Sequence, residues 1–148
     1  MLAMSKLLHI VAAIIWLGGM TFMLQALRPV VIAQLEPPVR LPLLASVLRR
    51  FFWAVWLSIA VLLASGLAML LAAGMARAPL GQHLMLVIGM AMALVFTHLF
   101  FGPFRLLRQA VAEGNWTAGG TQVGRLHRGV VTNFVLGWLA VAAVVLIR

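Results

Sequence analysis

The chain has 148 residues, 65 % of them hydrophobic and only 9 % charged, and its formal net charge is +9. About a quarter of the residues of an ordinary water-soluble domain are charged, so this composition excludes such a domain. Four segments are apolar over the roughly 20 residues that a helix needs to cross a hydrocarbon core about 30 Å thick. They are residues 7–27, 51–73, 84–104 and 129–147. We therefore predict one all-α domain over residues 1–148, a bundle of four transmembrane helices.

The first segment resembles a secretory signal peptide in that Lys6 precedes its apolar stretch. The stretch is longer than a typical signal core, and Arg28 and Pro29 follow it without a small-residue cleavage pattern. We therefore interpret residues 7–27 as a retained first helix.

One face of this first helix carries candidate metal ligands. His9, Met20 and Met23 recur at spacings that place them on one helical stripe, together with Ala13 and Trp16. Imidazole and thioether groups both suit the soft ion Cu(I). Methionine is also a common filler of hydrophobic cores, so plain packing is the alternative for the two methionines.

The second helix is expected to follow a break in the chain, because three prolines fall within residues 36–42. Ser58 and Ser65 are seven residues apart and lie on one face of this helix, with Gly66 beside the second serine. Small residues on one face indicate close helix packing. The same small side chains also leave the room that a flat cofactor needs.

The last two helices carry the remaining histidines. His83 begins the third helix and His98 follows fifteen residues later, inside an apolar run. The two imidazoles are then about 22 Å apart along the helix axis, too far to share one metal or one haem. The Gly-rich residues 113–125 are predicted to form a flexible loop. His127 lies at the start of the fourth helix, and Asn133 lies about two turns deeper.

The positive charges predict an orientation. Lys6, Arg77 and Arg148 lie on one side of the membrane, and eight arginines lie in the two connections on the other side. Those eight are Arg28, Arg40, Arg49, Arg50, Arg105, Arg108, Arg125 and Arg128. Positive residues in short loops stay cytoplasmic, so we expect both termini outside, in a bacterial inner membrane. Because these arginines lie at helix ends, we expect contact with anionic lipid and not with nucleic acid.

Depth decides which histidines can meet. His9 and His83 both lie at the predicted outer boundary, and we expect their Nε2 atoms to flank one metal or one haem iron. His98 should be roughly 9 Å deeper than His127 on the inner side, which is a poor match for two ligands of one haem.

His98 is the least expected polar residue, because an imidazole inside a membrane is costly without a partner. We expect its ring to point into the bundle, where it would bind a metal or haem, take part in proton or ion passage, or hydrogen-bond to Thr97, Asn133 or a backbone carbonyl. Arg105 is a candidate partner for haem propionates or for lipid phosphates, and Asn133 is a second polar candidate for contact with a cofactor.

Several stretches resemble the copper-resistance protein D (CopD) type of four-helix membrane protein. They include "LLHIVAAIIWLGGMTFML", "EPPVRL", "RFFWAVWLSIAVLLASG" and "FTHLFFGPFRLLRQAV". This resemblance implies copper handling. The chain is also distantly similar to the haem-binding membrane protoporphyrinogen oxidase group, through "LHI" on the first helix and histidines on the third. The lysine which that group carries near the start of the third helix is absent from "HLMLVIGM".

The missing residue types narrow the chemistry. The chain has no Cys and no Tyr, and its only acids, Glu36 and Glu113, lie in predicted connections. Disulfides, thiolate ligands and paired carboxylates are therefore excluded, and hydrolysis or proton-coupled transport is not expected. We leave open whether the protein is an enzyme, because any chemistry would belong to a bound cofactor.

Three functions remain. The first is a b-type haem protein that exchanges electrons with quinone or with a redox complex of the membrane. The second is a copper-handling permease whose ligands include His9, Met20 and Met23. The third is an accessory subunit, whose intramembrane polar residues only hold helices together. The lipid bilayer and a second copy of the chain are the other expected partners.

Overall fold

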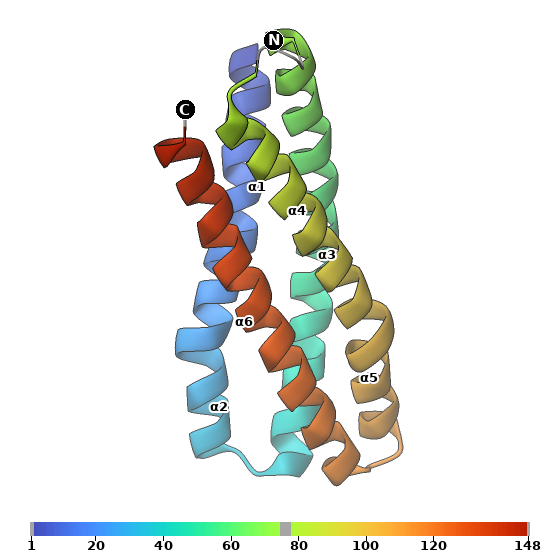
Figure 1. The fold of residues 1–148 in the computed structure, drawn as a ribbon. Helices are drawn as coiled ribbons and strands as arrows, with labels where there is room; N and C mark the ends of the chain where they lie inside the picture. The colour runs from blue at the N-terminus through green and yellow to red at the C-terminus, as the bar shows by residue number, and fades with distance from the viewer. Residues whose placement is uncertain (1, 75–77, 148) are drawn as a thin grey trace.

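The computed structural model describes residues 2–74 and 78–147, and these form four long helical spans (Figure 1). The first span is continuous through α1 (Leu2–Phe22), the π-helical segment η1 (Met23–Leu27) and α2 (Arg28–Gln34). The second span is α3 (Pro37–Ala73). The third runs through α4 (Leu80–Leu99), the π-helical segment η3 (Phe100–Phe104) and α5 (Arg105–Ala112). The fourth is α6 (Trp116–Leu146).

Each of these spans is long and apolar enough to cross a membrane. Large apolar side chains also cover the outside of the bundle, where Leu57 and Leu94 are each 68 % exposed. A bilayer solvates such a surface, whereas water does not. The predicted all-α bundle of four membrane-spanning helices is therefore confirmed.

The two ends of the bundle differ in what they carry. Both chain ends and the connection between α3 and α4 lie at one end, which we call the terminal end (Figure 1). The connections α2–α3 and α5–α6 lie at the opposite end, which we call the arginine end. The placement of the termini outside the cell stays a prediction, and Arg77 and Arg148 lie outside the described residues.

The helices reach further at the arginine end than the sequence predicted. Helix α3 begins at Pro37, because prolines at the first two positions of a helix lose no helical hydrogen bond. The flexible loop predicted over residues 113–125 is wrong, since α6 begins at Trp116. The Asn115 side chain caps this helix by accepting a hydrogen bond from the backbone N–H of Ala118 (3.0 Å). Gly119 packs against Leu41, and this contact offsets the low helix propensity of glycine.

The arginine half of the bundle is filled by aromatic rings. The ring of Phe52 lies 5.1 Å from that of Phe96 and 4.9 Å from that of Phe104, both in edge-to-face geometry. Trp16 and Trp56 pack against Phe96 at 6.3 and 5.1 Å. Such contacts add to the stabilisation from apolar burial. The half of the bundle towards the terminal end lacks this filling, and the candidate site lies there.

Candidate functional site

A cavity of about 560 Å³ lies between the four spans in the terminal half of the bundle. Helix α1 packs along α3, and α4 packs along α6. All four of these helices contribute to the cavity wall. Leu2, Ala73 and Val144, near the ends of three helices, line it, so the cavity extends to the terminal end. Its volume is that of a site for a small ligand.

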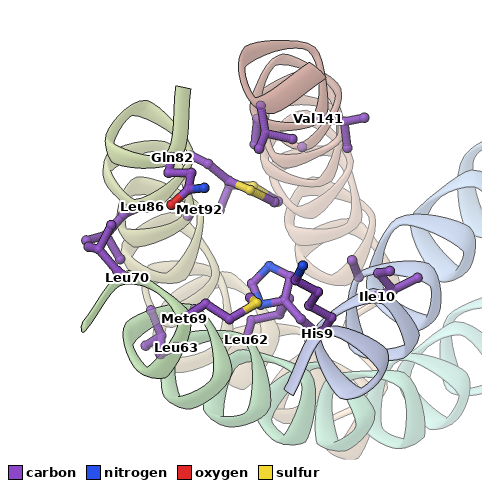
Figure 2. A pocket seen from close by; sticks show the side chains of 18 of the residues that line it. His9, Ile10, Leu62, Leu63, Met69, Leu70, Gln82, Leu86, Met92 and Val141 are labelled. Carbon is purple, nitrogen blue, oxygen red and sulfur yellow. The ribbon is translucent and has the colours of Figure 1, made fainter. Parts of the chain in front are cut away.

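Most of the cavity wall is apolar, and few polar groups face it. His9, Gln82 and the exposed Lys6 line the cavity. Figure 2 shows the imidazole ring of His9 on α1 and the side-chain amide of Gln82 on α4. Trp16, Ile59 and Met92 line its deep part, next to the aromatic core. The cavity therefore ends where the aromatic filling begins.

His9 is held by a hydrogen-bond chain that favours one tautomer of its ring. The Ser65 hydroxyl donates to the carbonyl oxygen of Val61, one turn earlier on α3 (2.5 Å). The Ser65 oxygen therefore accepts a hydrogen bond from Nδ1–H of His9, at 2.9 Å. With the ring proton on Nδ1, the Nε2 atom of His9 carries a free lone pair. Metal-binding histidines are characteristically held in this way, with the other ring N–H donated to an oxygen.

The glycine next to this serine leaves space for the His9 ring. A Cβ atom at position 66 would lie 3.3 Å from Cε1 of His9, so a larger residue than Gly66 would press on the imidazole. Ser65 and Gly66 therefore act together: the serine fixes the ring and the glycine leaves space for it. The small face predicted for the second helix is confirmed, and it serves His9 as well as helix packing.

Three methionines line the same cavity as His9. They are Met69 on α3 and Met85 and Met92 on α4. In Figure 2, Met69 reaches from α3 into the space that holds the His9 ring. Sequence reasoning missed these three residues, because it sought thioethers on the helix that carries His9. A signal was present in the nine methionines of the chain, but only the fold shows which of them share a cavity.

Met20 and Met23, the thioethers predicted to join His9, do not line the cavity. They share the inward face of the first span, as predicted, but Met20 is 1 % exposed and belongs to the hydrophobic core. Met23 lies in η1, closer to the arginine end. Both side chains therefore fill the core next to the aromatic rings, and the structure does not bring them together with His9 in this cavity.

His83 does not join His9 in the cavity, because it is not among the residues that line the wall. Its Nδ1 atom lies 3.3 Å from the carbonyl oxygen of Pro79, at the start of the same helix. The neighbouring Gln82 faces the cavity instead. The sequence placed His83 at the correct depth, but one residue changes the direction of a helical side chain by about 100°.

His98 is exposed on the outer surface of α4, so the prediction that its ring points into the bundle is wrong. The stripe that leads from His98 back along the helix is also exposed, with Leu94 at 68 % and Val87 at 64 %. The side chains predicted to satisfy it are engaged elsewhere. Thr97 donates to the carbonyl of Ala93 (2.8 Å). We therefore leave His98 out of the site proposed below.

The remaining two candidates lie away from the cavity wall. Asn133 is 2 % exposed and donates from Nδ2 to the carbonyl oxygen of Met92 (3.2 Å), a hydrogen bond that joins α6 to α4. Arg105 is exposed at the arginine end and begins α5. Asn133 therefore supports the deep wall of the cavity through Met92, whereas Arg105 lies at the opposite end of the bundle.

The cavity contains a different ligand set from the common metal sites. Among the residues that the structure describes, no group of three or more His, Cys, Asp or Glu side chains could hold a metal ion. The residues that line the cavity include no carboxylate, the ligand that hard cations prefer. One imidazole with thioethers nearby suits a soft ion of low charge, and Cu(I) is the biological example.

Comparison with known proteins finds a family whose description names copper. The family model of copper resistance protein D matches residues 45–147, a range that covers most of α3 and all of α4 to α6. The match thus includes Ser65 and the three cavity methionines, and it begins after the helix that carries His9. No curated protein and no solved structure matches the chain.

Proposed function

The chain belongs to the copper resistance protein D family, and on that premise we propose that it binds Cu(I) in the terminal cavity, at Nε2 of His9. The ion is the cargo of this site. The chain is a multi-pass membrane protein, and we place it in the bacterial inner membrane with the cavity facing outward. Copper would then enter from the side on which both termini lie.

The observation that carries this proposal is the hydrogen-bond chain from His9 to Ser65 to Val61. It holds the imidazole in the one tautomer that presents a lone pair at Nε2. The sulfur atoms of Met69, Met85 and Met92 are the candidate soft ligands, since all three line the same cavity.

The test is the Cu(I) affinity of the purified protein in detergent, measured by competition with a chromophoric Cu(I) chelator. We expect His9→Ala to weaken binding by more than about 100-fold, because removal of a ligand should exceed the 10–100-fold losses typical of its supporting partners. Leucine at positions 69, 85 and 92 together should have a similar effect, since leucine keeps the apolar volume and removes the sulfur.

Three control variants match these changes in kind. His83→Ala removes an imidazole at a similar depth that does not line the cavity, and it should leave the affinity unchanged. Met20→Leu and Met23→Leu remove thioethers from the core, and they should also leave it unchanged. Equal losses in His9→Ala and His83→Ala would contradict the proposed site.

Haem b is a second candidate, because the cavity volume of about 560 Å³ is much larger than one metal ion needs. Nε2 of His9 would hold the haem iron, and the apolar wall of the cavity would contact the porphyrin ring. A bound haem would supply one-electron redox chemistry. His83 lies outside the cavity and Arg105 lies at the other end of the bundle. The second imidazole and the propionate partner predicted from the sequence are therefore both absent from the cavity wall.

An absorption spectrum of the purified protein decides between copper and haem, since a Soret band favours haem. Exchange of electrons with quinone or a redox complex stays a prediction tied to this candidate.

A further inference from the structure

A second, smaller cavity of about 40 Å³ lies near the arginine end, between the first span, α3 and α6. Met23, Leu44, Leu48 and Leu126 supply apolar wall, and Arg28 and His127 supply the polar side chains. A space of this size holds one or two atoms of a polar group, and it excludes a whole organic ligand.

Both polar side chains of this cavity have a buried nitrogen without a partner. Nε of Arg28 and Nδ1 of His127 are fully covered, and neither has a hydrogen-bond partner among the described residues. The guanidinium is always charged, and its Nε–H can only donate. A buried donor left unpaired is costly, and more so when it is charged. An acceptor in this cavity would satisfy the Nε–H donor of Arg28, and negative charge on that acceptor would be favourable.

The depth of this cavity is that of lipid headgroups. Arg28 directly follows the apolar segment 7–27, and His127 precedes the apolar segment 129–147 by two residues. Membrane-spanning helices carry the headgroup boundary at such positions. The π-helical turn of η1 ends immediately before Arg28, so the backbone widens where this side chain enters the cavity.

The surroundings attract an anion. Eight arginines belong to the arginine end, and the only acidic residues of the chain are Glu36 and Glu113. Glu113 accepts a hydrogen bond from the neutral Gln109 amide (3.0 Å) and keeps its charge, so eight positive charges face two negative ones. The electrostatic potential around the cavity is therefore positive, as at known sites for anionic lipid headgroups between helices.

We propose that the cavity at Arg28 and His127 takes a phosphate oxygen of an anionic phospholipid. The oxygen accepts hydrogen bonds from Nε–H of Arg28 and from Nδ1–H of His127, while the rest of the headgroup stays outside the cavity and the acyl chains remain in the bilayer. This site is independent of copper binding, because it lies at the opposite end of the bundle.

The experiment compares lipid retention by native mass spectrometry and melting temperature in nanodiscs. One set of nanodiscs contains phosphatidylcholine alone, and the other contains phosphatidylcholine with phosphatidylglycerol. We expect one phosphatidylglycerol to be retained with about tenfold preference, the effect of a charge-assisted hydrogen bond. Arg28→Gln should abolish the preference. Arg50→Gln removes an equal charge from an exposed residue at the same end, and it should keep most of it.

Three results would overturn the proposal. Equal losses in Arg28→Gln and Arg50→Gln would indicate diffuse attraction between the arginine end and the membrane. A rise in melting temperature on adding inorganic phosphate to the phosphatidylcholine nanodiscs would indicate a free-phosphate site. If Arg28→Gln does not fold, His127→Phe provides the same test, and an unchanged lipid preference in it would overturn the proposed site, which needs both donors.

Discussion

The four spans of this bundle are similarly apolar, yet the bundle is filled in one half and hollow in the other. In the arginine half, the ring of Phe52 contacts the rings of Phe96, Phe100 and Phe104 at centroid distances of 4.9–6.2 Å. In the terminal half, the facing positions include Gly66, Gly89 and Gly137, and a cavity of about 560 Å³ remains. Side-chain size, and not hydrophobicity, therefore decides where the protein has room for a ligand.

This difference separates stability from binding. The aromatic half supplies the close packing that holds four helices together, because dispersion contacts are its main gain. The hollow half forgoes part of that packing and holds His9, the one histidine fixed by a serine on a neighbouring helix. Substitutions in the filled half should then lower the free energy of unfolding, whereas substitutions in the hollow half should mainly change Cu(I) affinity. The pairs of variants below test this difference.

The largest effect on stability is expected in the filled half. Phe52→Ala removes a ring that is 1 % exposed, and it should lower the free energy of unfolding by about 3–5 kcal/mol. Met69 borders an existing cavity, so Met69→Ala should lower the free energy of unfolding by less than about 1 kcal/mol and leave the fold intact. Denaturant unfolding in mixed micelles measures both. Similar costs for the two variants would show that the halves do not differ in packing.

Two glycines on α6 allow the same comparison with side chains that are enlarged and not shortened. A Cβ at Gly129 would overlap Leu99, a core residue that is 4 % exposed, so Gly129→Ala should cost about 1–3 kcal/mol. A Cβ at Gly137 would overlap Leu17, which lines the cavity and has space to move. Gly137→Ala should therefore cost less than Gly129→Ala in the same unfolding measurement.

A third glycine supplies the reference for that pair. Gly124 has open space around its would-be Cβ, so Gly124→Ala should be neutral or slightly stabilising. If all three variants lose equal stability, the cost comes from the helix backbone, and the packing difference between the halves is not its cause.

A smaller effect is expected in the hollow half from the partner of His9. Ser65→Ala removes the hydrogen-bond acceptor of Nδ1–H and should weaken Cu(I) binding by about tenfold, with little change in unfolding. Ser58→Ala is the matched control, since Ser58 donates to Ala54 within its own helix and does not line the cavity. An unchanged affinity in Ser65→Ala would remove the role assigned to the hydrogen-bond chain.

The smallest expected effect comes from the charge at the cavity. Lys6 is exposed and lines the cavity, so its ammonium group opposes a bound cation through water, with an energy below about 1 kcal/mol. Lys6→Gln should strengthen Cu(I) binding about twofold at low salt, and the gain should shrink as salt is added. Weaker Cu(I) binding in this variant would contradict the repulsion assigned to the Lys6 charge.

The sequence predicted the fold well and the site only in part, for physical reasons. Hydrophobic length alone locates four membrane-spanning helices, because a bilayer demands them. The helical run through Gly119 and Gly120 was predicted as a loop, since a propensity argument does not include the contact of Gly119 with Leu41.

For the site, the sequence predicted how far along its helix each histidine lies, but it did not predict the direction of the side chain. The sequence placed His9 and His83 at similar depth, and only His9 lines the cavity. His98 was expected inside the bundle because an imidazole in lipid is costly, yet the helix packs through Met92, Phe96 and Leu99 and turns His98 outward. Which methionines accompany His9 depends on contacts between helices, and a single sequence does not contain that information.

The coordination of copper tests the central claim most directly. X-ray absorption spectroscopy of the protein loaded with one equivalent of Cu(I) reports the ligand atoms around the ion. We predict one imidazole nitrogen together with thioether sulfur, and the loss of the nitrogen signal in His9→Ala. A spectrum with only nitrogen and oxygen ligands, or one that His9→Ala leaves unchanged, would contradict a copper site in the terminal cavity.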